Sequence, residues 1–198
     1  MDNFHSPFHN FFLYILFEIE LLVNGGFEEA DESGAPIGWL NGGGGIVWRC
    51  SANGDPMDGD SVPYNGEWMA CFDRSHKSSA DYYVYQDVNV TSHATAIDAS
   101  NAYVNATGYL ESDQAPSFDD VYLQVRFLDQ QKNEIPESRY DSGIQRPESW
   151  TRYGVQNHLV PATTRFIQIR FNTWENGWDA GSADEFSIQI KGTFHTVI

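Results

Sequence analysis

Apolar and polar residues alternate most regularly in two segments, 121–127 and 167–171. In the first, VYLQVRF, the Val, Leu, Val and Phe residues share one face, and in the second, IQIRF, the two Ile and the Phe do so. A period of two residues is that of a β-strand, so each segment predicts a strand with one buried face and one polar face. The polar faces carry Tyr122, Gln124, Arg126, Gln168 and Arg170.

The rest of the chain beyond residue 45 follows the same pattern of short strands. Runs of β-branched and aromatic residues are separated by Gly, Pro, Asn, Asp and Ser, which is typical of strands joined by loops. The chain has no convincing amphipathic helix, and nine short strands indicate an all-β sandwich. We expect strands near 17–23, 46–50, 67–72, 82–90, 103–111, 120–128, 150–159, 165–172 and 184–190.

The N-terminal segment does not fit this pattern. Residues 1–18 form an apolar arm rich in Phe, which is either a frayed terminus or an arm that docks onto a neighbouring subunit. In 17–23, FEIELLV, alternation places Ile19 and Val23 on one face, which predicts a strand with that face buried. With no internal repeat or linker, we expect the arm 1–18 and one domain, 19–198.

Composition restricts the partners of such a domain. The chain has 198 residues, 28 of them acidic and 11 basic, with a formal net charge of −17. Such a charge repels phosphate backbones and anionic lipid surfaces, so we expect no nucleic-acid partner. The 13 Phe, 10 Tyr and 6 Trp residues are too much apolar surface for a disordered acidic tail. Divalent cations and neutral ligands such as sugars are the natural partners that remain.

The N-terminal sequence favours neither export by a visible signal nor insertion into a membrane. The first basic residue is Arg49, whereas a secretory signal needs basic residues before its apolar stretch. The apolar run 11–17 is short, and Glu18 and Glu20 interrupt what would have to be about 20 apolar residues. We therefore expect no membrane span.

The chain has two cysteines, Cys50 and Cys71, each near the end of a predicted strand. A disulfide between them would suit an exported protein and would stabilise the fold by roughly 3 kcal/mol. Two separate buried thiols explain the sequence equally well. Without nearby His pairs, the two cysteines do not predict a zinc site.

Several short motifs occur in an order that is known from one superfamily. The segment 22–28, LVNGGFE, is followed by PIGW at 36–39, and the segment 182–190, SADEFSIQI, closes the pattern. YNGE, YQDV and YVNATGY lie between them. Together these motifs resemble the galactose-binding-like jelly rolls, the superfamily of many carbohydrate-binding modules. The resemblance covers about residues 19–192 and implies a jelly-roll β-sandwich of about nine strands, which here carries an N-terminal extension.

The resemblance also implies a structural calcium site. A jelly roll brings its first and last strands side by side, so that Glu28 and Asp184 would converge. Ca²⁺ takes six to eight oxygen ligands, and carbonyl groups of the Gly-rich turn 24–26 would add to the two carboxylates. Ca²⁺ would join the two chain ends and stabilise the fold without taking part in chemistry. The alternative is that Glu28 only caps the turn and Asp184 lies in solvent.

A ligand site for sugars needs exposed aromatic rings beside planar polar side chains. The loop 173–179, TWENGWD, supplies Trp174 and Trp178, and the polar faces of the strands near 120–128 and 165–172 form a groove floor if the strands share a sheet. Alternatively, the two Trp residues pack under their own loop, and the arginines on the strands pair with nearby acids.

No motif points to catalysis. The sequence lacks G-x-S-x-G, H-E-x-x-H, P-loop and G-x-G-x-x-G patterns, and its six His residues are scattered. A pair of carboxylates can always be chosen among 28, so their number is no evidence for a glycosidase. We therefore expect no enzyme.

Two functional hypotheses follow from the sequence. The first is a non-catalytic carbohydrate-binding β-sandwich with a structural calcium ion, working outside a cell or on the surface of a particle or filament. The alternative is a structural subunit of a filament, capsid or tail assembly. Such a subunit would self-associate through residues 1–18, which would add a strand to a neighbour's sheet.

Overall fold

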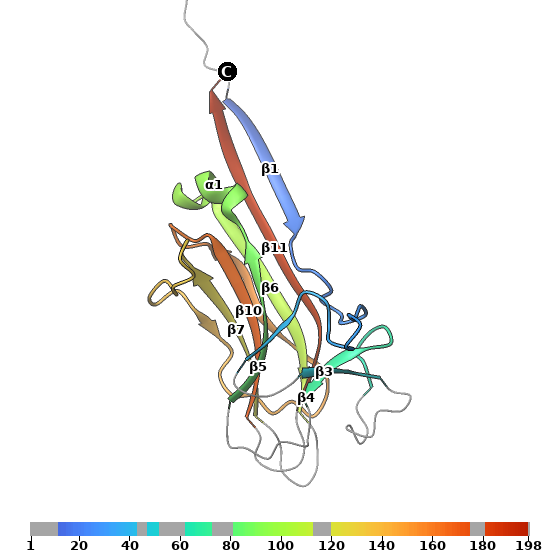
Figure 1. Ribbon diagram of the computed structural model, residues 1–198. Helices are drawn as coiled ribbons and strands as arrows, with labels where there is room; N and C mark the ends of the chain where they lie inside the picture. The colour runs from blue at the N-terminus through green and yellow to red at the C-terminus, as the bar shows by residue number, and fades with distance from the viewer. Residues whose placement is uncertain are drawn as a thin grey trace, which may run out of the picture.

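The computed structural model describes residues 12–42, 47–51, 62–72, 81–112, 120–174 and 181–197. They fold into two antiparallel β-sheets that lie face to face (Figure 1). This β-sandwich confirms the fold class that the sequence predicts. The five-stranded sheet contains, in order, β2 (Leu40–Gly42), β5 (Asp81–Asn89), β10 (Phe166–Trp174), β7 (Asp120–Leu128) and β8 (Tyr140–Asp141).

The six-stranded sheet contains both ends of the described chain. Its first strand, β1 (Phe12–Glu20), pairs with the second half of the last strand, β11 (Ser182–Val197). The order of the other strands is β3 (Val47–Cys50), β4 (Met69–Phe72), β11, β6 (Ala102–Glu111) and β9 (Thr151–Leu159).

The core lies between the two sheets and follows the alternation seen in the sequence. The inward side chains of β7, from Val121 to Phe127, and those of β10, from Ile167 to Phe171, are fully buried. Each contributes about 1.5–3 kcal/mol through removal of apolar surface from water. The rings of Phe27, Trp39 and Phe186 complete one end of the core, with centroid distances of 4.8 to 5.8 Å.

Four short elements are absent from the predicted set. The strands β2 and β8 have only three and two residues, too few to show a period. A single helical turn, η1 (Thr91–His93), leads into the short helix α1 (Ala94–Asp98) at one end of the sandwich. Ala96 and Ile97 of α1 are buried in the core, so packing rather than amphipathic length stabilises this helix.

The prediction for the first strand is wrong in its bounds and in its buried face. The strand ends at Glu20, and Ile19 and Val23 are 44% and 53% exposed. Ile19 lies opposite Ile190, which is fully buried, so both point to the same side of the sheet. Ile19 stays exposed because β1 lies at the margin of the sheet, where the opposite layer covers it incompletely.

The two chain ends form a ribbon that projects from the sandwich. β11 pairs with β6 only as far as Gly192, opposite Ala102, and residues 193–197 pair with β1 alone among the described strands. In Figure 1 this ribbon extends past α1, away from the body. Residues 12–18 of the predicted arm therefore belong to a strand of the chain's own sheet, and residues 1–11 lie outside the described part.

A disulfide joins Cys50 of β3 to Cys71 of β4, with 6.0 Å between their Cα atoms. Both cysteines are buried with Met69 in a small second cluster, against which Trp150 packs. The disulfide thus holds the outer two strands of the six-stranded sheet together. Of the two alternatives that the sequence left open, the structure contains the bonded pair.

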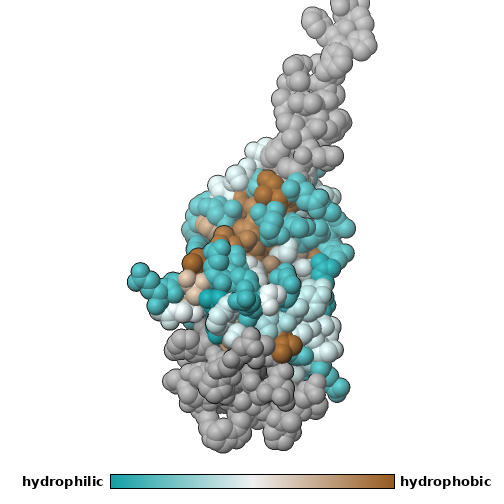
Figure 2. Space-filling model, turned by 90° about the vertical axis from the view of Figure 1, so that its right-hand side faces the viewer, coloured by the Kyte–Doolittle hydropathy of each residue, from teal (hydrophilic) through white to brown (hydrophobic). Residues whose placement is uncertain are grey.

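One side of the described surface is largely polar. Figure 2 shows a mostly hydrophilic side of the body with a limited group of hydrophobic residues in its upper part. None of the helices in the described ranges is long and apolar enough to span a membrane.

Candidate functional site

The outer face of the five-stranded sheet carries the polar residues singled out in the sequence. Strand β10 lies between β5 and β7 and pairs with both without a break in register. The two alternating segments therefore share a sheet, which is the condition that the sequence analysis set for a groove floor. The outward residues form three rows across β5, β10 and β7, namely Asp87–Gln168–Arg126, Tyr85–Arg170–Gln124 and Tyr83–Asn172–Tyr122.

The first row is held by a network of ion pairs. Arg126 donates a hydrogen bond of 2.9 Å to Gln168 and forms an ion pair with Glu134. Gln168 donates to Asp87 at 2.8 Å, and the Lys132 ammonium lies 2.8 Å from the other oxygen of Asp87. The segment after β7 thus folds back over this end of the sheet. For Arg126 the alternative reading, pairing with a nearby acid, is correct.

Glu134 is the centre of this network. Burial pushes the pKa of its carboxyl upward, but hydrogen bonds from Arg139 and Arg126, together with their charges, outweigh burial and lower the pKa below its usual value. The Arg139 Nε–Glu134 Oε1 distance is 2.7 Å. Glu134 therefore stays ionised and fixes the loop against the sheet.

The other two rows of this floor combine partly exposed side chains with the buried Gln124 and Asn172. The Arg170 guanidinium lies over the Tyr83 ring, and the Gln124 amide donates to Asp141 at 2.7 Å. Asn172 is fully buried, and its Oδ1 atom accepts no hydrogen bond from the described residues. A buried acceptor without a donor costs about 1–3 kcal/mol, so this atom lowers the stability of the sheet locally.

Sequence reasoning missed four members of the floor, Tyr83, Tyr85, Asp87 and Asn172. In the segment YYVYQDV of β5, Tyr82 is buried in the core whereas Tyr83 and Tyr85 face outward. Aromatic residues on both faces hide the period of two, which would otherwise have shown the outward positions.

The predicted aromatic loop lies mostly outside the described residues. The backbone of Trp174 ends β10 and pairs with Asp81 and Asp120. The side chain of Trp174 and all of Trp178 lie outside the described part of the chain, so their contact with a ligand stays a prediction.

The two predicted calcium ligands meet at one turn, 64–67. Glu28 Oε1 accepts hydrogen bonds from the backbone N–H groups of Glu67 and Trp68, at 3.0 and 3.1 Å. Asp184 Oδ2 accepts from the Asn65 N–H at 3.1 Å. The loop after β1 and the start of β11 therefore place both carboxylates beside this turn.

Asp184 is fully buried, so the alternative that it lies in solvent is wrong. Loss of solvent raises the pKa of its carboxyl to about 7, against the lowering effect of backbone hydrogen bonds from Asn65 and Glu185. The negative charges of Glu185 and Glu28 raise the pKa further. A cation here would stabilise the ionised form.

The surroundings offer fewer oxygens than Ca²⁺ prefers. The Asn24 carbonyl already accepts from Phe27 N–H and Trp39 Nε1–H, and the Gly25 carbonyl accepts from Phe186 N–H. Within the described residues, no three Asp, Glu, His or Cys side chains come together as a metal site. The two carboxylates fit a cation, but the turn carbonyls only partly supply the rest of its shell.

No family model matches the sequence, and no curated protein matches it either. Solved structures share the fold at low sequence identity. A Stig cyclase, Fisc, from Fischerella sp. TAU superposes with a TM-score of 0.61 at 10% identity, covering 89% of this chain and 99% of the cyclase. The CBM22-1 xylan-binding domain of Paenibacillus barcinonensis Xyn10C gives 0.53 at 16% identity, covering 87% and 94%.

The enzymatically active domain of tailspike protein 4 from bacteriophage CBA120 has the same fold in part of its chain. It gives a TM-score of 0.56 at 15% identity over 89% of this chain, which spans only 22% of that protein. These similarities show a β-sandwich shared by a carbohydrate-binding module, a cyclase and part of a phage protein. Fold alone therefore does not select among those functions.

Proposed function

We propose that the chain is a non-catalytic carbohydrate-binding β-sandwich whose ligand lies on the outer face of the five-stranded sheet. The observation that carries this proposal is the in-register floor on β5, β10 and β7. The similarity to a xylan-binding module of nearly the same length supports it. We place the protein outside the cell or on a particle surface, as is usual for modules that bind polysaccharides.

The floor offers the contacts that sugar recognition requires. Tyr122 brings a partly exposed aromatic ring, and such rings stack on the apolar face of a pyranose. Arg170 is partly exposed and presents a planar guanidinium that can donate to adjacent hydroxyl groups. Trp174 and Trp178, on the loop that follows β10, would add a wall.

The acidic groups on this face favour binding over catalysis. A glycosidase needs a carboxyl with a raised pKa as general acid opposite a second free carboxylate. Asp87 and Glu134 are both held in ion pairs with basic side chains, and the pKa of Glu134 is lowered. Asp141 accepts a hydrogen bond from Gln124. Each is therefore used to position the floor.

Titration calorimetry with xylohexaose tests the proposal. We expect binding by the wild type, and a loss of about tenfold or more in Tyr122→Ala and Arg170→Gln, because each removes one direct contact. Tyr103→Ala is the matched control, since Tyr103 is an exposed tyrosine on the other sheet. If a broad panel of polysaccharides, xylohexaose included, shows no binding, the proposal fails.

A structural Ca²⁺ at Glu28 and Asp184 is part of the same proposal. Its support is the meeting of the two carboxylates at the turn 64–67 and the raised pKa of Asp184. CaCl₂ should raise the melting temperature of protein first treated with a chelator, and Glu28→Gln should reduce that rise. An equal rise with MgCl₂, or none with either salt, would contradict a calcium site.

A structural subunit is the second candidate, and the projecting ribbon favours it. One edge of β1 pairs with β11, while its other edge has no partner strand among the described residues. An open edge can accept a strand from a neighbour. Residues 12–18 are not a free donor strand, because they already pair with β11 of the same chain.

Light scattering of the full chain and of a variant without residues 1–18 separates the two candidates. Oligomers that dissociate on deletion, with a cooperative thermal transition retained, would support the structural role. A full-length protein that is monomeric at high concentration would exclude self-assembly through this ribbon.

A further inference from the structure

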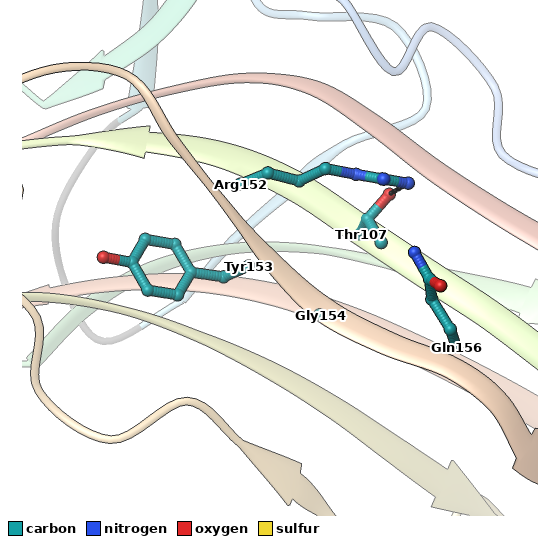
Figure 3. Close-up of a pocket in the computed structure, with 5 residues that line it drawn as sticks. All are labelled: Thr107, Arg152, Tyr153, Gly154 and Gln156. Atoms are coloured by element: carbon teal, nitrogen blue, oxygen red, sulfur yellow. Dashed lines mark hydrogen bonds between the residues drawn. The ribbon is translucent and has the colours of Figure 1, made fainter.

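The outer face of the six-stranded sheet contains a separate hollow, on the opposite side of the sandwich from the proposed sugar floor. It has a volume of about 410 Å³ and lies over β6 and β9. Figure 3 shows the side chains of Arg152, Thr107 and Gln156 pointing toward one another, while the Tyr153 ring points away. Thr107 faces Gly154 across the strand pair.

The hollow exists because residue 154 has no side chain. Arg152, Gly154 and Gln156 lie on the same face of β9, since residues two apart share a face. Gly154 has a φ of +140°, and a Cβ atom there would lie 2.0 Å from the Ala106 carbonyl oxygen. The backbone thus requires glycine and leaves a gap between two long polar side chains.

Arg152 supplies the positive charge in the lining of this hollow. Its guanidinium donates one hydrogen bond, of 3.2 Å, to the Thr107 hydroxyl. It forms an ion pair with none of the acidic residues that the structure describes, and the residue is exposed to solvent. By contrast, ion pairs with carboxylates engage Arg126, Arg139, Arg146 and Arg165.

An aromatic platform adjoins the hollow. Tyr109 is the direct partner of Arg152 in the pairing of β6 with β9. The Tyr64 ring stacks on Tyr109 with centroids 3.8 Å apart, and Trp150 supports Tyr64 from the side at 6.3 Å. Tyr64 remains 46% exposed, so a ring supported from below is presented to solvent beside a guanidinium.

We propose that this face is a second binding site, which takes a sugar unit bearing a carboxylate, such as a uronic acid. The pyranose ring would lie against Tyr64, and the carboxylate would accept two hydrogen bonds from Arg152, for which the planar guanidinium is suited. Thr107 and Gln156 would contact the remaining oxygens. With both faces occupied, one molecule would hold two sugar chains or two parts of one chain.

The overall charge limits the ligand to few acidic units. At a net charge of −17 the protein repels long polyanions, so phosphate polymers and long polyuronates are poor ligands. A single carboxylate beside Arg152 is attracted at short range, and the aromatic platform adds stacking that an inorganic anion cannot use.

Titration calorimetry with trigalacturonate, beside xylohexaose, tests this inference on the full chain. We expect trigalacturonate to bind the wild type, and Arg152→Gln and Tyr64→Ala to weaken that binding by about tenfold or more. The matched control is Arg146→Gln, which removes the same charge from another surface position and should change affinity less than about twofold. The methyl ester of trigalacturonate should bind wild type as weakly as the acid binds Arg152→Gln.

The outcome with trigalacturonate does not depend on the proposed sugar site on the five-stranded sheet. Loss of xylohexaose binding in Arg170→Gln concerns only the proposed function, and binding of trigalacturonate should persist in that variant. The inference is overturned if trigalacturonate does not bind the wild type, or if Arg152→Gln, with an unchanged circular dichroism spectrum, binds it as well as the wild type does.

Discussion

The guanidinium carbon of Arg170 lies 3.2 Å from the centroid of the Tyr83 ring. The residue directly opposite Arg170 on β5 is Tyr85, so the arginine reaches diagonally to the next outward position of that strand. The contact fixes a long cationic side chain against the sheet, with the guanidinium stacked on the ring. On that contact we base the first prediction.

Removal of the Tyr83 ring should weaken both folding and sugar binding. We expect Tyr83→Leu to lower the free energy of unfolding by about 1 kcal/mol, because the cation–π contact is lost. Affinity for xylohexaose should fall about tenfold as Arg170 becomes mobile. Tyr83→Phe keeps the ring and should retain both properties in urea denaturation and calorimetry. Equal losses in the two variants would show that the hydroxyl group, not the ring, matters.

The ion-pair network around Glu134 should make stability depend on pH. Its folded-state pKa is lowered, so the ionised carboxylate stabilises the fold above its unfolded value of 4.5, and this contribution is lost as the pH falls through the folded-state value. We expect Glu134→Gln to cost about 1–3 kcal/mol at pH 7. Urea denaturation should show that the difference from wild type narrows below pH 4.5. A difference that is constant from pH 7 to pH 3 would contradict this account.

Substitution of Gly154 should damage the six-stranded sheet. A Cβ atom there would meet the backbone of Ala106 and Thr107, and φ is +140°. We expect Gly154→Ala to lower the free energy of unfolding by about 1–3 kcal/mol. Gly34→Ala is the control: its φ is +86°, but no atom lies within 4 Å of the added carbon. Thermal melting should show a clearly smaller loss for Gly34→Ala.

The disulfide should contribute measurably to stability. Residues 50 and 71 are 21 positions apart, and closing a loop of that length stabilises by about 3 kcal/mol in the chain-entropy model. We expect the double variant Cys50→Ser, Cys71→Ser to lose about that amount in chemical denaturation. The wild type in excess reductant should lose stability to a similar extent. If reduction leaves the denaturation midpoint unchanged, the disulfide is not structurally important.

Much of the fold was predictable from local pattern, because a strand with one buried face shows it in sequence. The segments around Leu123 and Ile169 alternate cleanly, and their inward residues are all buried. The prediction of a buried face on the first strand was wrong, because local alternation does not report which residues the opposite sheet covers. Ile19 alternates like a core residue, but its burial depends on cover from the opposite sheet, which no local pattern reports.

The candidate sites were only partly predictable. The floor residues of β7 and β10 were found because their outward positions are polar, whereas Tyr83 was missed because Tyr82 and Tyr83 look alike in sequence. The pairing of Arg126 with Glu134 depends on how the loop after β7 folds back over the sheet. The hollow at Arg152 depends on Gly154 facing Thr107, a register that only strand pairing sets.

The sequence by itself therefore determined the class of fold, most strand positions and the acidic, aromatic character of the molecule, because these follow from side-chain period and composition. The tertiary structure alone decided which of these residues meet. Glu28 and Asp184 bind one turn although far apart in sequence, and the chain ends pair into a ribbon. Contacts between distant segments arise from sheet order and register, which are set by packing of the whole chain.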